Sequence, residues 1–324
     1  MIRTQTASCL FSAPFSFLGE LQGEFQRLMP TAFREIWKLE ELIPDPSLTA
    51  WVVNPGQQFQ VDRSVLDDFP ALAVIVTPST GRNHLDLQAC RERGVAVYSL
   101  LDDREGLNAI SASAEFTFLL LLNTLRRLDR AAAEVSAGRW REREEELRGR
   151  ELRGKQVGLV GLGRIGQRMA RYGTAFGARI VYYDPHVNST DYPAVSLTEL
   201  FSRSDAVCIC CALTPETEGL VTAELLNRLK PGACLVNTSR GEVIVEKDLE
   251  ELLERRRDLR VGLDVLAGET AGIHTRSPLL RFHRSGQIVI TPHAAGATVE
   301  SQTQAARVAW GLLHRHLERG FLEP

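Results

Sequence analysis

The sequence has little net charge and no long apolar run. Its 38 Lys and Arg against 41 Asp and Glu give a formal net charge of -3 at pH 7. This near balance excludes the strongly basic surface that is typical of proteins binding nucleic acid or anionic membranes. No segment of the sequence approaches the roughly 20 consecutive apolar residues that a membrane-spanning helix needs. We therefore expect neither a nucleic-acid partner nor a membrane.

Cysteine is scarce, with six in 324 residues, and the cysteines are not spaced like metal ligands. Cys208, Cys210 and Cys211 share the apolar segment AVCICCAL, in which a strand would turn Cys208 and Cys210 to one face. Because no second cluster of Cys or His at ligand spacing accompanies them, we predict buried strand cysteines and no metal site. This cysteine usage also favours a reducing, cytoplasmic compartment.

The N-terminal segment lacks the continuous apolar core of a secretion signal. In MIRTQTASCLFSAPFSFL, Ser, Thr and Gln residues interrupt the apolar ones. We predict that this segment forms a first strand rather than a cleaved leader.

Short β-branched runs alternate with helix-period segments along the chain. At 324 residues the chain exceeds the usual size of one hydrophobic core, so we expect two domains. The alternation predicts an α/β fold with parallel sheets that helices cover on both faces. In the first third, strands are predicted at 49–53, 72–76 and 95–99, and helices at 16–28, 62–68 and 84–93.

A long helical pattern and a charged segment follow. We predict one helix from about Ser111 to Val135, with the apolar run FTFLLLLNTL on its buried side. The segment at 138–155, GRWREREEELRGRELRGK, mixes charges of both signs with glycines. This composition is typical of a boundary between domains.

A glycine-rich turn between a predicted strand and a predicted helix opens the second half. The sequence KQVGLVGLGRIG at 155–166 places Gly161, Gly163 and Gly166 in the spacing G-x-G-x-x-G. This arrangement predicts a dinucleotide site, because the first glycine permits a tight turn, the second lets a pyrophosphate approach the backbone, and the third allows close helix–strand packing. The backbone amides that would face the phosphates are those around Arg164 and Ile165.

Asp184 ends the next predicted strand, ARIVYYD, about 20 residues beyond the glycines. Its carboxylate would accept hydrogen bonds from the adenosine ribose hydroxyls and would repel a 2′-phosphate. We therefore expect NAD rather than NADP as the cofactor. Taken alone, Asp184 also fits a plain turn residue before Pro185.

Arg240, Glu269 and His293 each lie just beyond a different predicted strand. Ligands bind at the carboxyl ends of the strands in parallel sheets of this kind, so we expect these three side chains at one rim. A lone histidine after a strand is more often idle, and the convergence of three such side chains is what favours a functional site. The strands of this half are predicted at 206–210, 233–237, 260–265 and 287–290.

Several segments together resemble one family. NTSRGEVI, LDVLAGE and TPHAAGAT resemble, in order and spacing, the three signature segments of the D-isomer-specific 2-hydroxyacid dehydrogenases. GLGRIG is similar to that family's nucleotide loop, and STGRNHLD at 79–86 to its substrate loop. The resemblance implies two doubly wound parallel-sheet domains, with a Rossmann NAD-binding domain at 105–292 inserted in a flavodoxin-like substrate domain at 1–104 and 293–324. We expect no regulatory domain after Pro324.

The resemblance implies that Arg240, Glu269 and His293 are catalytic. Interconverting a 2-keto acid and a 2-hydroxy acid requires a hydride carrier, an acid or base, and a cation that orients the carboxylate. An imidazole such as that of His293 serves as acid or base near neutral pH. Glu269 beside it would fix the ring and favour its protonated form. Arg240 offers a planar fork for the carboxylate and carbonyl oxygens.

The resemblance also implies contacts with the cofactor. Asp264 and the backbone at Thr238 would hold the nicotinamide carboxamide, and the backbone near Cys211 would touch the cofactor. Gly296, together with the two alanines before it, would leave room for the nicotinamide ring beside His293.

For the substrate, the resemblance implies that the backbone amides of Ser79, Thr80 and Gly81 receive the carboxylate, together with Arg240. We interpret Asn83 and His84 as caps of the helix that follows. His274 lies in a segment longer than is usual in the family, and it is either a further site residue or part of a solvated loop, which is the favoured interpretation.

The N-terminal loops bear on which acid is the substrate. The loop NPGQQFQ at 54–60 carries no cation for a phosphate, which favours a small unphosphorylated acid such as glyoxylate or hydroxypyruvate. Arg82 is a nearby alternative phosphate ligand, so a 3-phosphoglycerate dehydrogenase stays open. A NAD-sensing corepressor on the same fold also stays open, although the three catalytic-type residues argue against it. We expect a homodimer through the 111–153 region.

Overall fold

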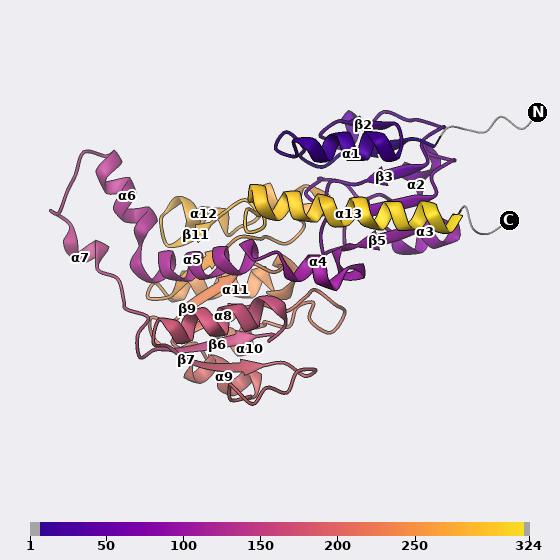
Figure 1. Cartoon of the computed structure of the whole chain (residues 1–324). Helices are drawn as coiled ribbons and strands as arrows, with labels where there is room; N and C mark the ends of the chain where they lie inside the picture. Colours follow the sequence, from indigo (N-terminus) through magenta and orange to yellow (C-terminus); the bar gives the residue numbers. More distant parts are fainter. Residues whose placement is uncertain (1–6, 321–324) are drawn as a thin grey trace, which may run out of the picture. The chain divides into compact units, whose positions relative to one another are not determined.

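The computed structural model describes residues 7–320, and the chain forms two compact units (Figure 1). The first unit runs to Ile110 and takes in Thr270–Gly272 and the chain from Ala297 onward. The second unit comprises Ser111–Glu269 and Ile273–Gly296. The domain ends predicted from the sequence lie after residues 104 and 292, and the structure divides after Ile110 and Gly296.

The first unit is a parallel sheet with helices on both faces. Its described strands are β1 (Cys9–Phe11), β2 (Thr31–Phe33), β3 (Ala50–Val52), β4 (Val74–Thr77) and β5 (Ala96–Ser99), in the order β2-β1-β3-β4-β5. Its helices are α1 (Glu20–Leu28), α2 (Arg63–Asp67), α3 (Leu87–Glu92), α4 (Arg104–Asn108) and α13 (Val299–Gly320).

Alternation along the buried strands explains this layering. In β3, Val52 packs into the layer of α1, α4 and α13, and Trp51 packs into the layer of α2 and α3. Both side chains are completely buried. A strand that is apolar on both sides therefore needs helices on both sides, as the sequence predicts.

The second unit is a larger parallel sheet of the same kind. Its described strands are β6 (Gln156–Val160), β7 (Arg179–Tyr183), β8 (Ala206–Ile209), β9 (Cys234–Asn237), β10 (Arg260–Leu263) and β11 (Ile288–Ile290), in the order β11-β10-β9-β8-β6-β7. The helices of the unit are α5 (Ala112–Arg126), α6 (Leu128–Ser136), α7 (Glu144–Leu147), α8 (Arg164–Ala175), α9 (Leu197–Arg203), α10 (Ala223–Leu226), α11 (Glu246–Arg255) and α12 (Leu280–Arg284).

Helices α5 and α8 lie side by side on one face of this sheet, and α9 to α12 pack on the other (Figure 1). Strand β6 pairs with both β7 and β8, so the order of the strands reverses at β6. Ligands of doubly wound sheets bind beyond the carboxyl ends of the strands at such a reversal. The predicted fold class, two doubly wound parallel sheets, is confirmed.

The predicted single helix at 111–135 is wrong. Helix α5 ends at Arg126, and α6 begins at Leu128. Between them Arg127 has a φ of 55°, a left-handed conformation that ends a helix. Apolar residues continue past this point, so the hydrophobic pattern gives no sign of the break.

Two further features differ from the sequence predictions. The three-residue strand β2 is too short to be predicted from periodicity. The charged segment at 138–155 lies inside the second unit and not at its boundary. This segment contains α7, and its Glu146 forms an ion pair with Arg130 of α6.

The six cysteines are all free. Of the three predicted to be buried in a strand, Cys208 is buried in β8, but Cys210 and Cys211 follow the strand and are only partly buried, so that prediction is wrong for these two. In the second sheet, Cys208 and Cys234 are fully buried. Burial raises the pKa of both thiols. Among the residues that the structure describes, no helix is both long and apolar enough to cross a membrane. The same residues contain no group of three or more His, Cys, Asp and Glu side chains placed to hold a metal ion.

Candidate active site

The turn after β6 brings the backbones of two strands together. Gly161 has a φ of 96°, and its N–H donates to the carbonyl oxygen of Tyr183 at 2.7 Å. A Cβ at Gly161 would lie 2.8 Å from the backbone nitrogen of Cys211, beyond β8, so a side chain has no room. A Cβ at Gly166 would lie 2.2 Å from the carbonyl oxygen of Gly161, which puts α8 directly on the turn. Gly163 has no described atom within 4 Å of its Cβ position and faces open space.

Asp184, directly after β7, holds the same turn. Its Oδ2 accepts the N–H of Leu162 at 2.8 Å, and its Oδ1 accepts that of His186 at 2.9 Å. A carboxylate has about four acceptor positions, so further hydroxyl donors can bind. Arg164 and Ile165 are the first residues of α8 at the same turn, so their N–H groups lie at the positive end of the helix dipole. The turn therefore offers the donors and the acceptor that a dinucleotide needs.

His293 and Glu269 form a hydrogen-bonded pair. The His293 Nδ1 and the Glu269 Oε2 are 2.6 Å apart, and the Glu269 Oε1 accepts the N–H of Leu266 at 2.6 Å. The side chains are 42% and 26% exposed, so the pair is open to one side. Within residues 7–320 the imidazole makes no other hydrogen bond, which leaves its Nε2 for an external partner. The structure thus brings together two of the three residues predicted to be catalytic.

Asp264 holds the turn that carries His293. It is fully buried, and its Oδ1 accepts from the Oγ1 of Thr291 at 2.5 Å and from the N–H of Ala294 at 2.9 Å. Its Oδ2 accepts from the N–H of Ala295 at 2.8 Å. His293 itself has a φ of 53°, and its N–H donates to the carbonyl oxygen of Asp264 at 2.8 Å. Burial raises the pKa of Asp264, and these hydrogen bonds oppose the shift.

The Asp264 carboxylate, which the resemblance assigns to a nicotinamide carboxamide, is therefore engaged by three donors of its own chain. These hydrogen bonds hold the turn in which His293 adopts a left-handed backbone conformation. That conformation costs free energy in a residue other than glycine, and it persists only where the surrounding structure enforces it. That conformation directs the His293 ring to Glu269.

Arg240 follows β9, next to β10 in the sheet. Its carbonyl oxygen accepts the Nδ2 of Asn237 at 2.9 Å, and its Nη1 donates to the carbonyl oxygen of Ser239 at 2.6 Å. Burial lowers the pKa of the half-buried guanidinium, while the charges of Glu269 and Glu242 oppose this shift. Within the described residues Arg240 forms no ion pair, so most of its five N–H donors are available.

The loops that carry Arg240 and Glu269 touch through their backbones. A Cβ at Gly241 would lie 2.0 Å from the carbonyl carbon of Leu266, so only glycine permits this approach. Glu246 Oε1 accepts the N–H of Ala267 at 2.7 Å, and Glu242 Oε1 accepts that of Gly268 at 3.1 Å.

Sequence reasoning does not single out Glu242 and Glu246. They follow Arg240 closely in the signature segment, which is the one available signal. Their partners lie 26 and 21 residues further along the chain, a separation that no local pattern spans.

The remaining predicted cofactor residues line the same rim. Thr238 is buried, with its Oγ1 2.6 Å from the Oγ1 of Thr117 on α5. Burial raises the pKa of the Cys211 thiol to about 11, so the thiol stays protonated. Gly296 is open, since the nearest described atom to its Cβ position is the Oγ of Ser113 at 3.9 Å.

The predicted substrate loop belongs to the first unit and follows β4. The Ser79 Oγ donates to the carbonyl oxygen of Gly81 at 2.7 Å, which curls the loop. The backbone N–H groups of Ser79, Thr80 and Gly81 donate no hydrogen bond to any described residue. Successive free amides of this kind form an anion-binding concavity.

The interpretation of Asn83 and His84 as helix caps is wrong. Asp86 caps α3, with its carboxylate accepting the N–H groups of Gln88 and Ala89. Aspartate is among the strongest N-cap residues, so the competing signal was present in the sequence. His274 lies in a 3-10 turn (Ile273–Arg276), where its Nδ1 is buried without a hydrogen-bond partner, and within the described residues it forms no hydrogen bond or ion pair with the three predicted catalytic side chains.

A family model, related sequences and solved structures all match the same family. Residues 118–295 match the family described as D-isomer specific 2-hydroxyacid dehydrogenase, NAD binding domain. D-3-phosphoglycerate dehydrogenase of Mycobacterium bovis is 35% identical over 250 residues, which are 76% of this chain and 45% of that protein. The chain thus spans less than half of that relative's length.

Two further relatives match over most of their own lengths. Hydroxypyruvate reductase of Thermotoga maritima is 32% identical over 259 residues, which are 79% of this chain and 81% of that protein. Among solved structures, D-lactate dehydrogenase from Aquifex aeolicus, complexed with NAD and lactic acid, has a TM-score of 0.80 and 25% identity, with 97% of this chain and 96% of that chain covered.

Proposed function

The chain belongs to the D-isomer-specific 2-hydroxyacid dehydrogenases, and we propose that it interconverts a small 2-keto acid and its D-2-hydroxy acid with NAD. The observation that carries this proposal is the 2.6 Å contact between His293 and Glu269 at the carboxyl end of the NAD-binding sheet. In this reaction a bound nicotinamide supplies or accepts the hydride.

His293 is the acid and base of the proposed reaction. With its Nδ1 engaged by Glu269, its Nε2 is the nitrogen that delivers a proton to the carbonyl oxygen during reduction and removes it during oxidation. The carboxylate, 2.6 Å from Nδ1, fixes the orientation of the ring, as an acidic partner does in other acid–base pairs. Glu269 is itself held by the backbone of Leu266, so the ring is oriented before substrate binds.

Arg240 orients the substrate. Its guanidinium is half-buried and unpaired within the described residues, and its planar fork suits a carboxylate and the neighbouring carbonyl oxygen. A fixed cation there also stabilises the negative charge that develops on the carbonyl oxygen during hydride transfer. The free amides of Ser79, Thr80 and Gly81 supply the further donors that we assign to the substrate carboxylate.

The cofactor contacts follow from the turn after β6. The open face at Gly163 and the amides of Arg164 and Ile165 suit the pyrophosphate. Asp184 suits the adenosine ribose, and its negative charge favours NAD over NADP. The open backbone at Gly296 and the rim near Thr238 and Cys211 are where we place the nicotinamide end.

The proposed substrate is unphosphorylated, of the glyoxylate or hydroxypyruvate kind. The loop at 54–60 supplies no cation for a phosphate. The alternative substrate, 3-phosphoglycerate, is favoured by Arg82. The Arg82 side chain is exposed and forms no hydrogen bond or ion pair with the described residues.

The deciding assay is a panel of 2-keto acids with NADH and NADPH in parallel. We expect glyoxylate or hydroxypyruvate with NADH to give the highest kcat/KM. A higher kcat/KM for a phosphorylated acid than for every unphosphorylated one would overturn the substrate proposal. Tight NADH binding without turnover of any acid would favour a NAD-sensing corepressor and overturn the enzymatic proposal.

We also propose a homodimer in a reducing, cytoplasmic compartment. The 111–153 region exposes large apolar side chains, with Leu128 at 59% and Trp140 at 71% exposed, which a second copy would cover. Six free cysteines fit a reducing compartment. Light scattering on the purified protein checks the dimer, and a monomeric mass that persists at high concentration would contradict it.

A further inference from the structure

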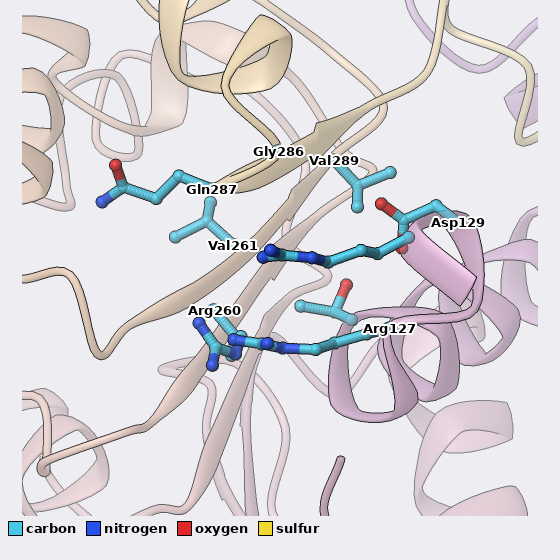
Figure 2. Close-up of a pocket in the computed structure, with 9 residues that line it drawn as sticks. Arg127, Asp129, Arg260, Val261, Gly286, Gln287 and Val289 are labelled. Carbon is cyan, nitrogen blue, oxygen red and sulfur yellow. The ribbon is translucent and has the colours of Figure 1, made fainter. Parts of the chain in front are cut away.

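A hollow lined by three arginines lies in the second unit (Figure 2). The space that the centre of a water-sized group can occupy in it is about 20 Å³, and the whole hollow measures about 300 Å³ when space open to solvent is included. Its walls come from the junction of α5 and α6 and from the amino ends of β10 and β11. The polar residues that line it are Thr124, Arg127, Asp129, Arg130, Arg260 and Gln287.

Two of the three arginines, Arg127 and Arg260, form no ion pair with a carboxylate of the described residues. Figure 2 shows the side chains of Arg127 and Arg260 extending into the same hollow. Arg260, the first residue of β10, has no side-chain hydrogen bond or ion pair with any described residue. Arg127 donates from its Nη1 to a backbone carbonyl, that of Glu146, and not to a carboxylate.

The nearby acids leave an excess of positive charge. The Glu146 carboxylate is paired with Arg130. Asp129 is exposed, and within the described residues its carboxylate pairs with none of the three arginines. Burial lowers the pKa of the Arg127 guanidinium and the charge of Arg130 adds to that shift, while the charges of Asp129 and Glu146 oppose it. Three guanidinium groups thus face two carboxylates, and the remaining positive charge in a partly buried site favours a further anion.

We propose that this hollow binds a phosphate group, either as the free ion or as a small phosphate monoester. Guanidinium groups present parallel N–H donors that match phosphate oxygens, and such charge-assisted hydrogen bonds are stronger than neutral ones. Val261 and Val289 form an apolar floor beside the arginines, which reduces competition from water.

This site is distinct from the candidate active site. Arg260 begins β10, and Asp264, which holds the His293 turn, follows its other end. Four residues of extended strand separate them by roughly 13 Å. The dinucleotide, the substrate carboxylate and the proposed phosphate therefore have separate places.

The test is calorimetric titration of the whole chain with inorganic phosphate. Saturating NADH is present throughout, so that phosphate cannot bind at the turn after β6, and added chloride keeps the ionic strength constant. The variant is Arg260→Gln, and the matched control is Arg179→Gln. Like Arg260, Arg179 is the first residue of a strand at the same edge of the same sheet, although it is more exposed, and β7 lies four strand spacings, roughly 19 Å, from β10.

We expect phosphate to bind the wild type, Arg260→Gln to weaken binding about tenfold or more, and Arg179→Gln to leave it within about twofold. Equal affinity of the wild type and Arg260→Gln, or no phosphate binding to the wild type, would overturn the proposal. Should Arg260→Gln fail to fold, Arg130→Gln is expected to weaken binding in the same way, and unchanged affinity there counts against the site. A parallel titration with glycerol phosphate distinguishes a phosphate monoester from the free ion. Tighter binding of glycerol phosphate than of inorganic phosphate indicates a monoester, and equal or weaker binding indicates the free ion.

Discussion

Replacing Gly241 by alanine tests whether the contact between two loops sets the catalytic geometry. The new Cβ would lie 2.0 Å from the carbonyl carbon of Leu266, 2.2 Å from the nitrogen of Ala267 and 2.4 Å from the oxygen of Leu266. All three atoms are backbone, so no flexible side chain can move aside. Ordinary carbon contacts are near 3.5 Å, so the loops must separate by about 1.5 Å.

This separation moves Arg240 away from the pair of Glu269 and His293. A displacement of about 1 Å in a catalytic site lowers rates by about 10²-fold, which corresponds to roughly 2.7 kcal/mol of transition-state stabilisation. Overpacking also costs about 1–3 kcal/mol of stability. NADH affinity should fall much less than turnover, because the groups that we assign to the pyrophosphate and the adenosine ribose follow β6 and β7 and lie apart from Gly241.

Steady-state reduction of glyoxylate or hydroxypyruvate, NADH titration by fluorescence and thermal unfolding together measure these effects. The matched control is Gly311→Ala on α13, where the nearest atom to the new Cβ is the flexible end of Arg315 at 3.6 Å. We expect the control to keep full turnover and to gain a little stability from helix propensity. A folded Gly241→Ala variant with wild-type turnover would refute the reasoning.

Three other predictions concern single carboxylates. Glu269→Gln removes the negative charge beside the His293 Nδ1 but keeps the shape of the side chain, so kcat should fall about 10²-fold with NADH affinity unchanged. A kcat within threefold of wild type would exclude a catalytic role for Glu269. Asp184→Ala should weaken NADH binding about tenfold or more and reduce the enzyme's preference for NADH over NADPH. Paired titrations with the two cofactors measure this preference, and an unchanged preference would exclude Asp184 from cofactor selection. The Arg256 guanidinium holds the pKa of Asp258 well below its ordinary value, with help from the N–H of Gly232. The ionised carboxylate therefore stabilises the fold above about pH 4, and this stabilisation is lost as the pH falls further. Asp258→Asn should cost about 1 kcal/mol at pH 7 and progressively less below about pH 4 in denaturant titrations, and a difference independent of pH would contradict this assignment.

The parts of the site that follow from strand ends could be predicted from the sequence. Parallel strands present their carboxyl ends at one edge, so residues placed just after β9 and β11 had to lie near one another. The glycine spacing after β6 likewise reflects steric limits within a few residues, which a sequence pattern records directly.

The parts that depend on distant backbone contacts could not be predicted. Glu246 supports the loop of Glu269 through an amide 21 residues away, and nothing in either segment marks the pairing. The break between α5 and α6 depends on the left-handed backbone conformation of Arg127. Arginine rarely adopts this conformation, so its presence in an apolar helical pattern does not predict a break. The three hydrogen bonds accepted by Asp264 are also visible only in the folded chain.

The most direct test of the proposed mechanism is the turnover of His293→Gln with NADH bound. His314→Gln is the matched control, because His314 also lies beside a glutamate, with its Nδ1 3.5 Å from the Oε2 of Glu318 on α13. The account predicts that His293→Gln loses roughly 10²–10⁴ in kcat with nearly unchanged NADH affinity, while His314→Gln keeps the kcat of the wild type. A kcat for His293→Gln equal to that of the control would contradict the account.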